Sequence, residues 1–350
     1  MKKQISFIIL ILIACSCLGQ GSYRFRVMSY NVENLFDYQH DSLKNDYEFL
    51  PDAARHWDRQ KYQKKLDDLG RVITAVGEWT PPALVGLCEV ENEHCLTDLT
   101  EHSILKEAGY RYAMTESPDQ RGIDVALLYQ REVFKPVSIH TYRVPPLSKT
   151  RNATRDILHV TGELPNHSLL DVFVCHFPSR SGGEKESEPY RLLAAGVLKQ
   201  AVDSLLQTRK KAQVIIMGDF NDYHNNRSIT EMVGAQHVTT LKADKQSLYH
   251  LLAAKEVTFK DYGSYRYRGK WSSLDHLIVN GRLLRQKGSF HIMPSEDDFL
   301  VKADVFAANF LLEDDTRYGG KLPFRTYAGT KYQGGYSDHL PIFADFILKY

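Results

Sequence analysis

The sequence predicts an α/β protein built from layers of sheet and helix. Short apolar runs of β-type residues end repeatedly in polar clusters, and two longer segments between them have the three- and four-residue periodicity of amphipathic helices. Hydrophobic residues make up 43% of the 350 residues and charged residues 25%, with 22 Gly and 13 Pro, which excludes disordered, collagen-like and coiled-coil chains. A chain of this length forms one large domain or two ordinary ones.

The N-terminus has the pattern of an export signal. Two lysines precede an apolar run over residues 5–14, and the small residues of 15–20 follow, so we predict a signal peptide in residues 1–20. The run is shorter than the ~20 residues that a spanning helix needs, and no transmembrane span is expected elsewhere. Its end also resembles a bacterial lipobox. Acylation of Cys15 would then anchor the protein to a membrane, whereas cleavage after Gly19 would release it, so we expect an exported protein, either periplasmic or attached to the outer membrane as a lipoprotein.

The net charge and the cysteine content argue against two kinds of protein: one with a global basic field, and one held by a disulfide framework. The formal net charge is +1, and loss of the predicted leader with its two lysines lowers it to −1, so no global basic field exists to hold a polyanion. The leader contains two of the five cysteines. The remaining three, Cys88, Cys95 and Cys175, are an odd number, which argues against a disulfide framework.

The strands and helices follow one another without an internal repeat or linker, so we expect a single domain over residues 22–350. Amphipathic stripes predict helices over 61–77 and 189–206, the second with Pro189 near its first turn. The aperiodic segments 37–57 and 294–336 are expected to form functional loops. The main β-type runs are residues 24–29, 83–88, 124–129, 170–175, 214–217, 274–279 and 340–348.

Carboxylate, carboxamide and imidazole side chains gather where these runs end, which is where an α/β sheet exposes side chains to a ligand. Any one of them alone is more simply a loop cap. The whole set is rich in oxygen and lacks the spacing of a zinc site, so it favours a hard cation, Mg²⁺ or Mn²⁺. Its members are Asn31, Glu89, His176, Asp219, Asn221, Asp275, Asp338 and His339.

Five segments that contain these residues resemble, in order, the motif series of the endonuclease/exonuclease/phosphatase superfamily, which includes deoxyribonuclease I-like enzymes. The resemblance spans nearly the whole mature chain and implies a four-layer α/β sandwich, with two mixed sheets face to face, helices on both outer faces and an active site at one edge. The segments are 29–35 (Ser-Tyr-Asn-Val-Glu-Asn-Leu), 87–92 (Leu-Cys-Glu-Val-Glu-Asn), 218–222 (Gly-Asp-Phe-Asn-Asp), 274–276 (Leu-Asp-His) and 336–341 (Tyr-Ser-Asp-His-Leu-Pro).

The resemblance also implies a metal site and a pair of residues that align the attacking water. Glu89, with Asn31 and Asp338 near it, would hold the cation, while Asp219 and Asn221 would align the attacking water and hold the phosphoryl group. Phosphoester chemistry needs these groups, because a cation neutralises the charge that grows on the phosphoryl oxygens and a base must deprotonate or orient the water. The proton acceptor stays open, since either Asp219 or an Asp–His pair could serve.

Two carboxylate–imidazole pairs complete the implied site. Asp275 and His339 resemble the pair beside the scissile phosphate. His176 matches the imidazole of a second pair found in the deoxyribonuclease branch, and Asp124 is our choice for its carboxylate.

Anion-binding residues are predicted on two segments. Arg155 begins the run 154–160, where family members often carry a basic residue that reaches a phosphate. Arg180 lies in the glycine-containing loop after His176, whose backbone could approach an anion closely. Arg325 lies near the 336–341 motif by sequence proximity alone, and a structural role is its simpler interpretation.

The leading hypothesis is therefore an exported, divalent-metal-dependent phosphoester hydrolase, more specifically a phosphodiesterase or nuclease, because His176 and its loop are closest to the nuclease branch. The near-zero net charge favours the alternative, a hydrolase of a small or lipid phosphoester such as a sugar phosphate, an inositol phosphate or a phospholipid headgroup. A third hypothesis, a binding protein that has lost catalysis, is disfavoured because no motif residue is missing. We expect a monomer whose partner is the phosphoester substrate.

Overall fold

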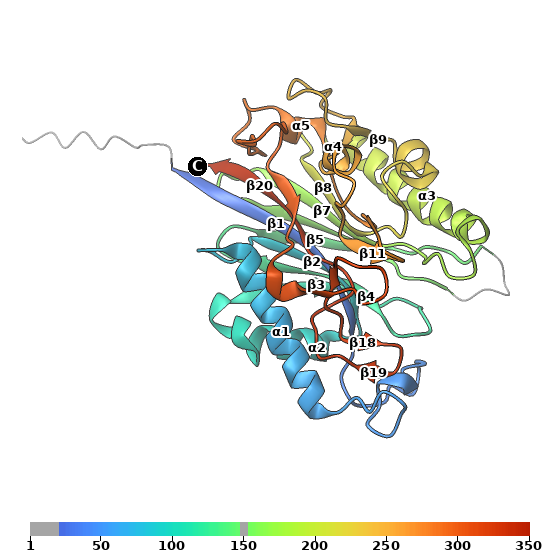
Figure 1. The fold of residues 1–350 in the computed structure, drawn as a ribbon. Coiled ribbons are helices and arrows are strands. Elements are labelled where there is room, and N and C mark those ends of the chain that lie inside the picture. The colour runs from blue at the N-terminus through green and yellow to red at the C-terminus, as the bar shows by residue number, and fades with distance from the viewer. Residues whose placement is uncertain (1–20, 148–152) are drawn as a thin grey trace, which may run out of the picture.

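The structure is a computed structural model that describes residues 21–147 and 153–350. The predicted signal peptide and Cys15, its candidate acylation site, lie outside the described residues. Figure 1 shows the chain ending beside the beginning of its first strand, where Ser22 pairs with Lys349. No helix in the described part of the chain combines the length and the apolar character needed to cross a membrane.

The first large sheet, sheet A, contains both the first and the last long strand of the chain. Its spatial order is β14-β20-β1-β2-β4-β3, with β15 also paired to β20. Strands β1 and β2 are parallel, and β1 pairs with β20 in antiparallel fashion, so the sheet is mixed. The strands are β1 (Ser22–Leu35), β2 (Leu84–Val90), β3 (Tyr110–Met114), β4 (Asp124–Gln130), β14 (Phe290–Ile292), β15 (Ala303–Val305) and β20 (Ile342–Lys349).

The second large sheet, sheet B, comes from the middle of the chain and has the order β5-β6-β7-β8-β13-β10-β9. It is also mixed, because β7 and β8 are parallel while β8 and β13 are antiparallel. Its strands are β5 (Lys135–Tyr142), β6 (Ile157–Glu163), β7 (Leu169–His176), β8 (Val214–Asp219), β9 (Ala235–His237), β10 (Leu248–His250) and β13 (Asp275–Asn280).

Short ribbons and helical turns occupy the loops. The ribbons are β11–β12 (Tyr265–Tyr267 and Lys270–Ser272), β16–β17 (Leu312–Asp314 and Lys321–Pro323) and β18–β19 (Tyr327–Ala328 and Lys331–Tyr332). The helical turns are η1 (Tyr47–Phe49), η2 (Ile104–Ala108), η3 (Ser228–Val233) and η4 (Asn309–Leu311), and the short helices are α4 (Ala253–Thr258) and α5 (Gly281–Leu284).

Three longer helices cover the sheets: α1 (Arg59–Gly77), α2 (Glu93–Glu101) and α3 (Glu184–Thr208). Helices α1 and α2 each begin at a side chain that caps their N-terminus. Asp58 accepts a hydrogen bond from Lys61 N, and Asn92 accepts one from Cys95 N. The third begins earlier than we predicted, at Glu184, so Pro189 lies inside the helix rather than in its first turn. The proline is tolerated because this end of the helix is exposed and water can solvate the carbonyl that lacks its usual N–H partner.

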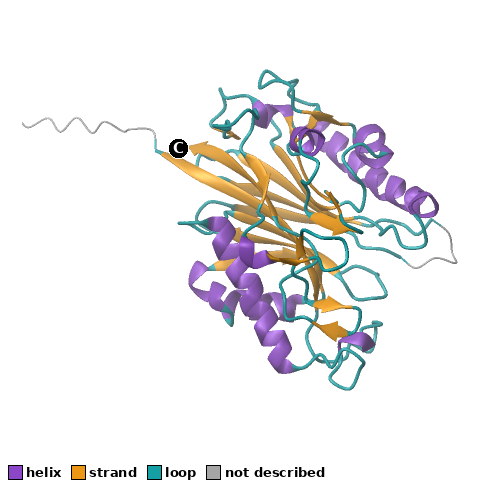
Figure 2. Cartoon of the chain, viewed as in Figure 1, coloured by secondary structure: helices purple, strands orange, loops and turns teal. Residues whose placement is uncertain are grey.

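Alternate residues of the central strands pack on opposite sides of each sheet. Val27 and Leu127 point between the sheets toward Val172 and Met217, and the neighbouring positions on sheet A pack against α1 and α2. Helix α3 packs on the outer face of sheet B. The layers are therefore helix, sheet, sheet and helix, as Figure 2 shows. This arrangement confirms the predicted four-layer α/β sandwich.

Candidate active site

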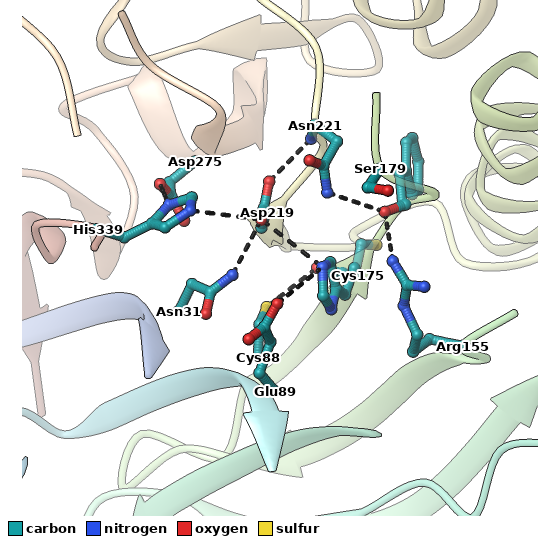
Figure 3. A network of polar contacts seen from close by, with 12 residues as sticks. Asn31, Cys88, Glu89, Arg155, Cys175, Ser179, Asp219, Asn221, Asp275 and His339 are labelled. Atoms are coloured by element: carbon teal, nitrogen blue, oxygen red, sulfur yellow. Dashed lines mark hydrogen bonds and ion pairs between the residues drawn. The ribbon is translucent and has the colours of Figure 1, made fainter. Parts of the chain in front are cut away.

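Three predicted site residues stand in one row across sheet B. In the pairing of β7 with β8, His176 is opposite Asp219, and in the pairing of β8 with β13, Asp275 is opposite Asp219. Each side chain continues the set that faces between the sheets: His176 follows Val172 and Val174, just as Asp219 follows Ile215 and Met217. The inward positions thus change from apolar to polar at one edge of the sandwich, and the side chains converge there (Figure 3).

Sheet A contributes Asn31 and Glu89 to the same edge. Asn31 pairs with Cys88 on the neighbouring strand, and the ladder is interrupted immediately afterwards, at Glu89. The two sheets are close here, because Cys88 Sγ lies 3.3 Å from the carbonyl oxygen of Cys175. Glu89 Oε2 accepts a hydrogen bond from Asn34 N at 3.0 Å, which orients its carboxylate.

Unusual backbone conformations concentrate at this edge. Glu33, Asn34, Glu89 and Asn221 have positive φ angles, between 50° and 69°, which cost free energy for residues with a side chain and often mark functional sites. Gly218, before Asp219, has φ of 136°, and a Cβ there would lie 1.9 Å from the carbonyl oxygen of Cys175. Only glycine can therefore hold Asp219 in its register beside β7.

Asp219 is the centre of the polar cluster. Its Oδ2 accepts a hydrogen bond from Asn31 Nδ2 at 3.0 Å, and its Oδ1 accepts one from Asn221 N at 2.8 Å. The same Oδ2 lies 3.6 Å from His176 Nε2 and 3.9 Å from His339 Nε2. Burial raises the pKa of Asp219 to about 7, although the charge of His339 opposes the rise. A carboxyl group with this pKa can exchange a proton near neutral pH.

His339 and Asp275 form the expected carboxylate–imidazole pair. His339 Nδ1 lies 2.7 Å from Asp275 Oδ2, which also accepts a hydrogen bond from Ser264 Oγ at 2.5 Å. Burial alone would lower the pKa of His339, but the charge and hydrogen bond of Asp275 raise it well above its usual value. The ring is therefore an imidazolium held in one orientation.

His176 has the opposite character. Burial, followed by the charges of Arg155 and Arg121, lowers its pKa well below the usual value, so the imidazole is neutral. Its Nε2 faces Asp219 and Glu89, at 3.6 and 3.9 Å, and its buried Nδ1 has no hydrogen-bond partner among residues 21–147 and 153–350.

The predicted pairing of His176 with Asp124 is wrong. Asp124 Oδ1 accepts hydrogen bonds from Thr115 Oγ1 and from Ser117 N, at 2.5 and 2.9 Å, and ties the loop before β4 to that strand. Its position at the first residue of β4, opposite Val90, directs it into this loop. The sequence pattern could not reveal this, because the serine and threonine that satisfy Asp124 are ordinary loop residues.

Asn221 and Arg155 meet at one backbone atom. Asn221 Nδ2 and Arg155 Nη2 both donate to the carbonyl oxygen of Phe177, at 3.0 and 2.6 Å (Figure 3). Arg155 precedes β6 rather than lying in it, and its other terminal nitrogen donates to Asp119 at 3.3 Å. Its buried Nε has no hydrogen-bond partner in the part of the chain that the structure describes. Arg155 thus lies beside the cluster with one donor still unused.

Arg180 does not point toward Asp219 with a free guanidinium. It forms an ion pair with Glu184, lies 3.8 Å from Asp222 Oδ1 and stacks over the ring of Tyr223 at 4.1 Å. Its charge is therefore already balanced by carboxylates, and its predicted role as a free anion-binding residue is not supported.

Asp338 reaches the site edge together with residues that sequence reasoning did not assign. Arg325 Nη2 donates to Asp338 Oδ2 at 2.5 Å, although a structural role was its simpler interpretation. Glu33 accepts hydrogen bonds from Thr326 N and Tyr327 N, at 2.6 and 3.3 Å, and so holds the loop that carries Arg325. The sequence signal that could have identified Glu33 as a site residue is its position within the 29–35 motif.

A buried cation supports this loop. Lys65 on α1 donates to Thr326 Oγ1 and to the carbonyl oxygen of Tyr336, at 2.6 and 2.5 Å. Burial lowers the pKa of Lys65 to about 8, and it raises the pKa of Glu33 to about 7.

Asn31, Glu89 and Asp338 suit a hard divalent cation. They offer two carboxylates and an amide oxygen, and within the described part of the chain Asn31 Oδ1 accepts one hydrogen bond, from Glu33 N, so a lone pair remains for a metal. Ser337 Oγ donates to the carbonyl oxygen of Asn31 at 2.7 Å and links the segment of Asp338 to β1. The donor set therefore fits magnesium or manganese better than zinc.

A second cluster, His250, Glu256 and His276, has the residue types of a metal site but not the proton arrangement. His250 Nδ1 accepts hydrogen bonds from Leu252 N and Ala253 N, which places the imidazole proton on Nε2. That proton points at His276 Nδ1, 2.6 Å away. The nitrogen that a metal would need is thus already protonated, and the cluster is a hydrogen-bonded chain.

A pocket of about 350 Å³ opens next to Arg155. Asp119, Arg121, Ser179 and Tyr190 contribute to its walls together with apolar residues of the segment before β6. In Figure 3, Arg155 and Ser179 lie on one side of Asp219, and His339 and Asp275 lie on the other. A substrate group bound in this pocket would thus adjoin Asp219 on the side away from His339.

Several solved structures have the same fold as this chain. The chain is similar to the mannosyl-6-phosphatase of Bacteroides thetaiotaomicron (16% identity, 92% of this chain and 99% of that chain covered, TM-score 0.54). It is also similar to the human Nocturnin catalytic domain with bound sulfate anion (17%, 93% and 97%, TM-score 0.53) and to D. rerio TDP2 complexed with single strand DNA product (12%, 92% and 98%, TM-score 0.53). At these identities the similarity shows the fold. No curated protein matches the chain in sequence.

Two face-to-face mixed sheets with a polar edge of this composition define a metal-dependent phosphoester hydrolase. The sequence profile described as Endonuclease/Exonuclease/phosphatase family matches residues 26–348, and the chain belongs to that family. Enzymes of this family typically use a divalent metal ion.

Proposed function

We propose that the protein is a phosphodiesterase that uses Mg²⁺ or Mn²⁺ to cleave nucleic acid. One observation carries this proposal: Asp219 Oδ2 lies 3.6 Å from His176 Nε2 and 3.9 Å from His339 Nε2, two imidazoles whose pKa values are shifted in opposite directions by their surroundings. Groups whose pKa values are driven apart in one site are suited to act as base and acid. Hydrolysis of an unactivated diester needs both, because water must lose a proton and the leaving oxygen must gain one.

Asp219 is the proposed base. Its pKa of about 7 is close to the working pH, so it can accept the proton as the water oxygen bonds to phosphorus. The ester P–O bond breaks in the same displacement, and the leaving oxygen takes a proton from His339. Asp275 keeps His339 protonated and oriented for this step. Asn221, held against Phe177, orients the phosphoryl group.

Asn31, Glu89 and Asp338 are the proposed metal ligands. A cation bound there would neutralise charge that develops on a non-bridging phosphoryl oxygen. Neutral His176 faces Asp219 from the opposite side and adds no second positive charge. This division explains how two imidazoles within 4 Å of one carboxylate can have different roles.

The nucleic-acid part of the proposal rests on His176, which matches the nuclease branch, and on the similarity to D. rerio TDP2 complexed with single strand DNA product. A specific observation favours a second candidate, a small-molecule phosphoesterase. The pocket of about 350 Å³ beside Arg155 has the size for a sugar or nucleoside and carries hydroxyl groups. The similar mannosyl-6-phosphatase acts on a phosphosugar, as its name states.

A hydrolysis panel tests the proposal. Purified protein with Mg²⁺ or Mn²⁺ is assayed on single-stranded DNA, duplex DNA, RNA, bis-p-nitrophenyl phosphate and sugar phosphates, with Asp219→Asn as the inactive control. We expect metal-dependent cleavage of nucleic acid, with affinity that falls as salt is added. Hydrolysis of phosphomonoesters alone would establish the second candidate instead.

We also propose that residues 22–350 form one exported, monomeric domain and that the leader within residues 1–20 is cleaved. Two lysines followed by a short apolar run fit translocation better than folding. The intact mass of the protein isolated from its native cell envelope should begin at acylated Cys15 or after Gly19. A cytoplasmic protein that still carries residues 1–20 would contradict export.

A further inference from the structure

A short hairpin beside the active site contains aromatic and basic residues in alternation. It consists of β11, β12 and the turn between them, residues 265–272 (Tyr-Arg-Tyr-Arg-Gly-Lys-Trp-Ser), and we refer to it as the aromatic hairpin. Tyr265 forms a backbone bridge with His339, and the centroids of the two rings are 4.9 Å apart. The aromatic hairpin thus begins against the proposed catalytic acid.

Beyond Tyr265, the aromatic hairpin exposes Tyr267, Arg268 and Lys270, while Arg266 and Trp271 pack inward. Tyr267 is 57% exposed, and the guanidinium of Arg268 lies over its ring at 5.1 Å. Lys270 is exposed, and Trp271 is partly exposed. An exposed ring with cations around it has the composition of a surface that stacks bases and attracts phosphates.

A second pocket, of about 380 Å³, lies at this surface. Tyr267, Trp271 and Lys270 of the aromatic hairpin form one part of its lining, and Tyr223 and Lys260 contribute another. Tyr223 is only four residues after Asp219, in the same loop, so the pocket adjoins the catalytic edge. A planar group could stack in it while the connected phosphate reaches Asp219.

The positive charges here differ from the arginines nearer Asp219. Arg180 and Arg325 are bound to carboxylates, whereas Arg268, Lys270 and Lys260 form no ion pair among the described residues. The one carboxylate in the lining, Glu256, is paired with His224 at 2.8 Å. The free cations give this side of the site the local positive charge that the whole chain lacks.

The aromatic hairpin is also held rigidly. Arg266 contacts Asp315 Oδ2 at 2.8 Å and donates to the carbonyl oxygen of Gly319 at 2.6 Å. Gly269 turns the chain with φ of 80°, and a Cβ there would lie 2.8 Å from Tyr318 Cβ. A rigid surface loses little conformational entropy when a flexible strand binds to it.

We propose that the aromatic hairpin and its pocket bind single-stranded nucleic acid next to the scissile phosphate, with a base stacked on Tyr267 and a flanking phosphate at Arg268 and Lys270. The inference rests on the proposed function and specifies its substrate. Bases in a duplex are already stacked on one another, so only an unpaired strand can use the rings. Small phosphoesters do not extend to this surface.

The test compares a chain substrate with a minimal one. The triple variant Tyr267→Ala, Arg268→Ala, Lys270→Ala and the wild type are assayed on a 12-nucleotide single-stranded DNA and on bis-p-nitrophenyl phosphate. We expect the ratio of the two kcat/KM values, DNA over small diester, to fall at least tenfold, mainly through KM. Loss of the contacts to this one phosphate should also reduce the slope of log KM against log salt by about 0.7.

Two further variants keep the result interpretable. Trp79→Ala with Lys135→Ala removes an exposed ring and a cation at the far end of the strands and should leave the ratio unchanged. Tyr267→Phe with Lys270→Arg should keep at least half of the wild-type activity on DNA, because stacking and charge remain. A triple variant with the wild-type ratio, or with equal losses on both substrates, would overturn the role of the aromatic hairpin. A wild type that cleaves the small diester but no nucleic acid would instead contradict the proposed function.

Discussion

His339 Nδ1 lies 2.7 Å from Asp275 Oδ2, and the two residues come from segments 64 positions apart in the sequence. Asp275 is fixed by its place opposite Asp219 on β13, and His339 is fixed by its bridge to Tyr265. The pair is therefore set by two independent parts of the fold. This geometry makes the protonation of His339 depend directly on one carboxylate.

Replacing Asp275 with Asn should lower kcat about 10²-fold and change its pH dependence. The Asp275 charge raises the pKa of His339, so its removal lowers that pKa. His339 then loses its proton at lower pH, and the alkaline limb of the kcat profile shifts downward. A profile with an unchanged alkaline limb would show that His339 is not the acid.

Replacing Glu89 with Ala should abolish metal-dependent activity while the fold remains. The residue is at a strand end with its side chain directed to the site edge, and loss of a metal's charge stabilisation is worth several kcal/mol. Activity is measured across a Mg²⁺ titration, with exposed Glu93→Ala as the control. Retention of more than about a tenth of kcat at saturating Mg²⁺ would count against Glu89 as a ligand.

Replacing Asp219 with Asn should inactivate the enzyme but stabilise it at neutral pH in the absence of metal. The pKa of Asp219 rises from 3.8 to about 7 on folding, so ionising this carboxyl in the folded state destabilises it as pH increases from about 4 to about 7. The Asn variant escapes this penalty, and we expect a gain of about 1–3 kcal/mol at pH 8 and little gain at pH 4. Thermal unfolding in EDTA at both pH values provides the measurement, and an equal change at both would contradict the raised pKa.

His176 and Asp124 should respond differently to substitution, because they do not form a pair. His176→Ala is expected to reduce kcat by about 10²-fold or more with a small effect on stability. Asp124→Ala should instead lower stability by about 1–3 kcal/mol, since Thr115 and Ser117 lose their shared acceptor. Denaturant unfolding and steady-state kinetics are measured for both, and a kcat loss as large for Asp124→Ala as for His176→Ala would restore the predicted pair.

The layered fold and most of the site edge could be predicted because both depend on local patterns. Alternation in β7 and β8 places His176 and Asp219 in phase with the apolar residues between the sheets, and this phase is visible in the sequence. The apolar stripe of Leu66, Leu69 and Ile73 likewise predicts helix α1 from the sequence. The motif residues then mark where each strand reaches the functional edge.

The contacts that the sequence missed all involve a loop or a short ribbon on at least one side. Arg325 meets Asp338, and Glu33 meets Thr326 across 293 positions, through hydrogen bonds that have no periodic signature. The aromatic hairpin likewise reaches His339 only through the bridge of Tyr265. Loop conformations follow from turns, backbone hydrogen bonds and single side-chain contacts, and these depend on neighbours that the fold brings together.

From the sequence alone, the class of fold, the family resemblance and the residues that stand at strand ends were determined, because hydrophobic periodicity and short motifs are local properties of the chain. Only the tertiary structure decided that Asp124 is not the partner of His176. Asp275 reaches His339 while Asp124 turns to Ser117, and the difference lies in strand register and in the direction each strand end faces. Those are set by packing between segments far apart in the chain, where a shift of one residue would direct the side chain to the opposite face.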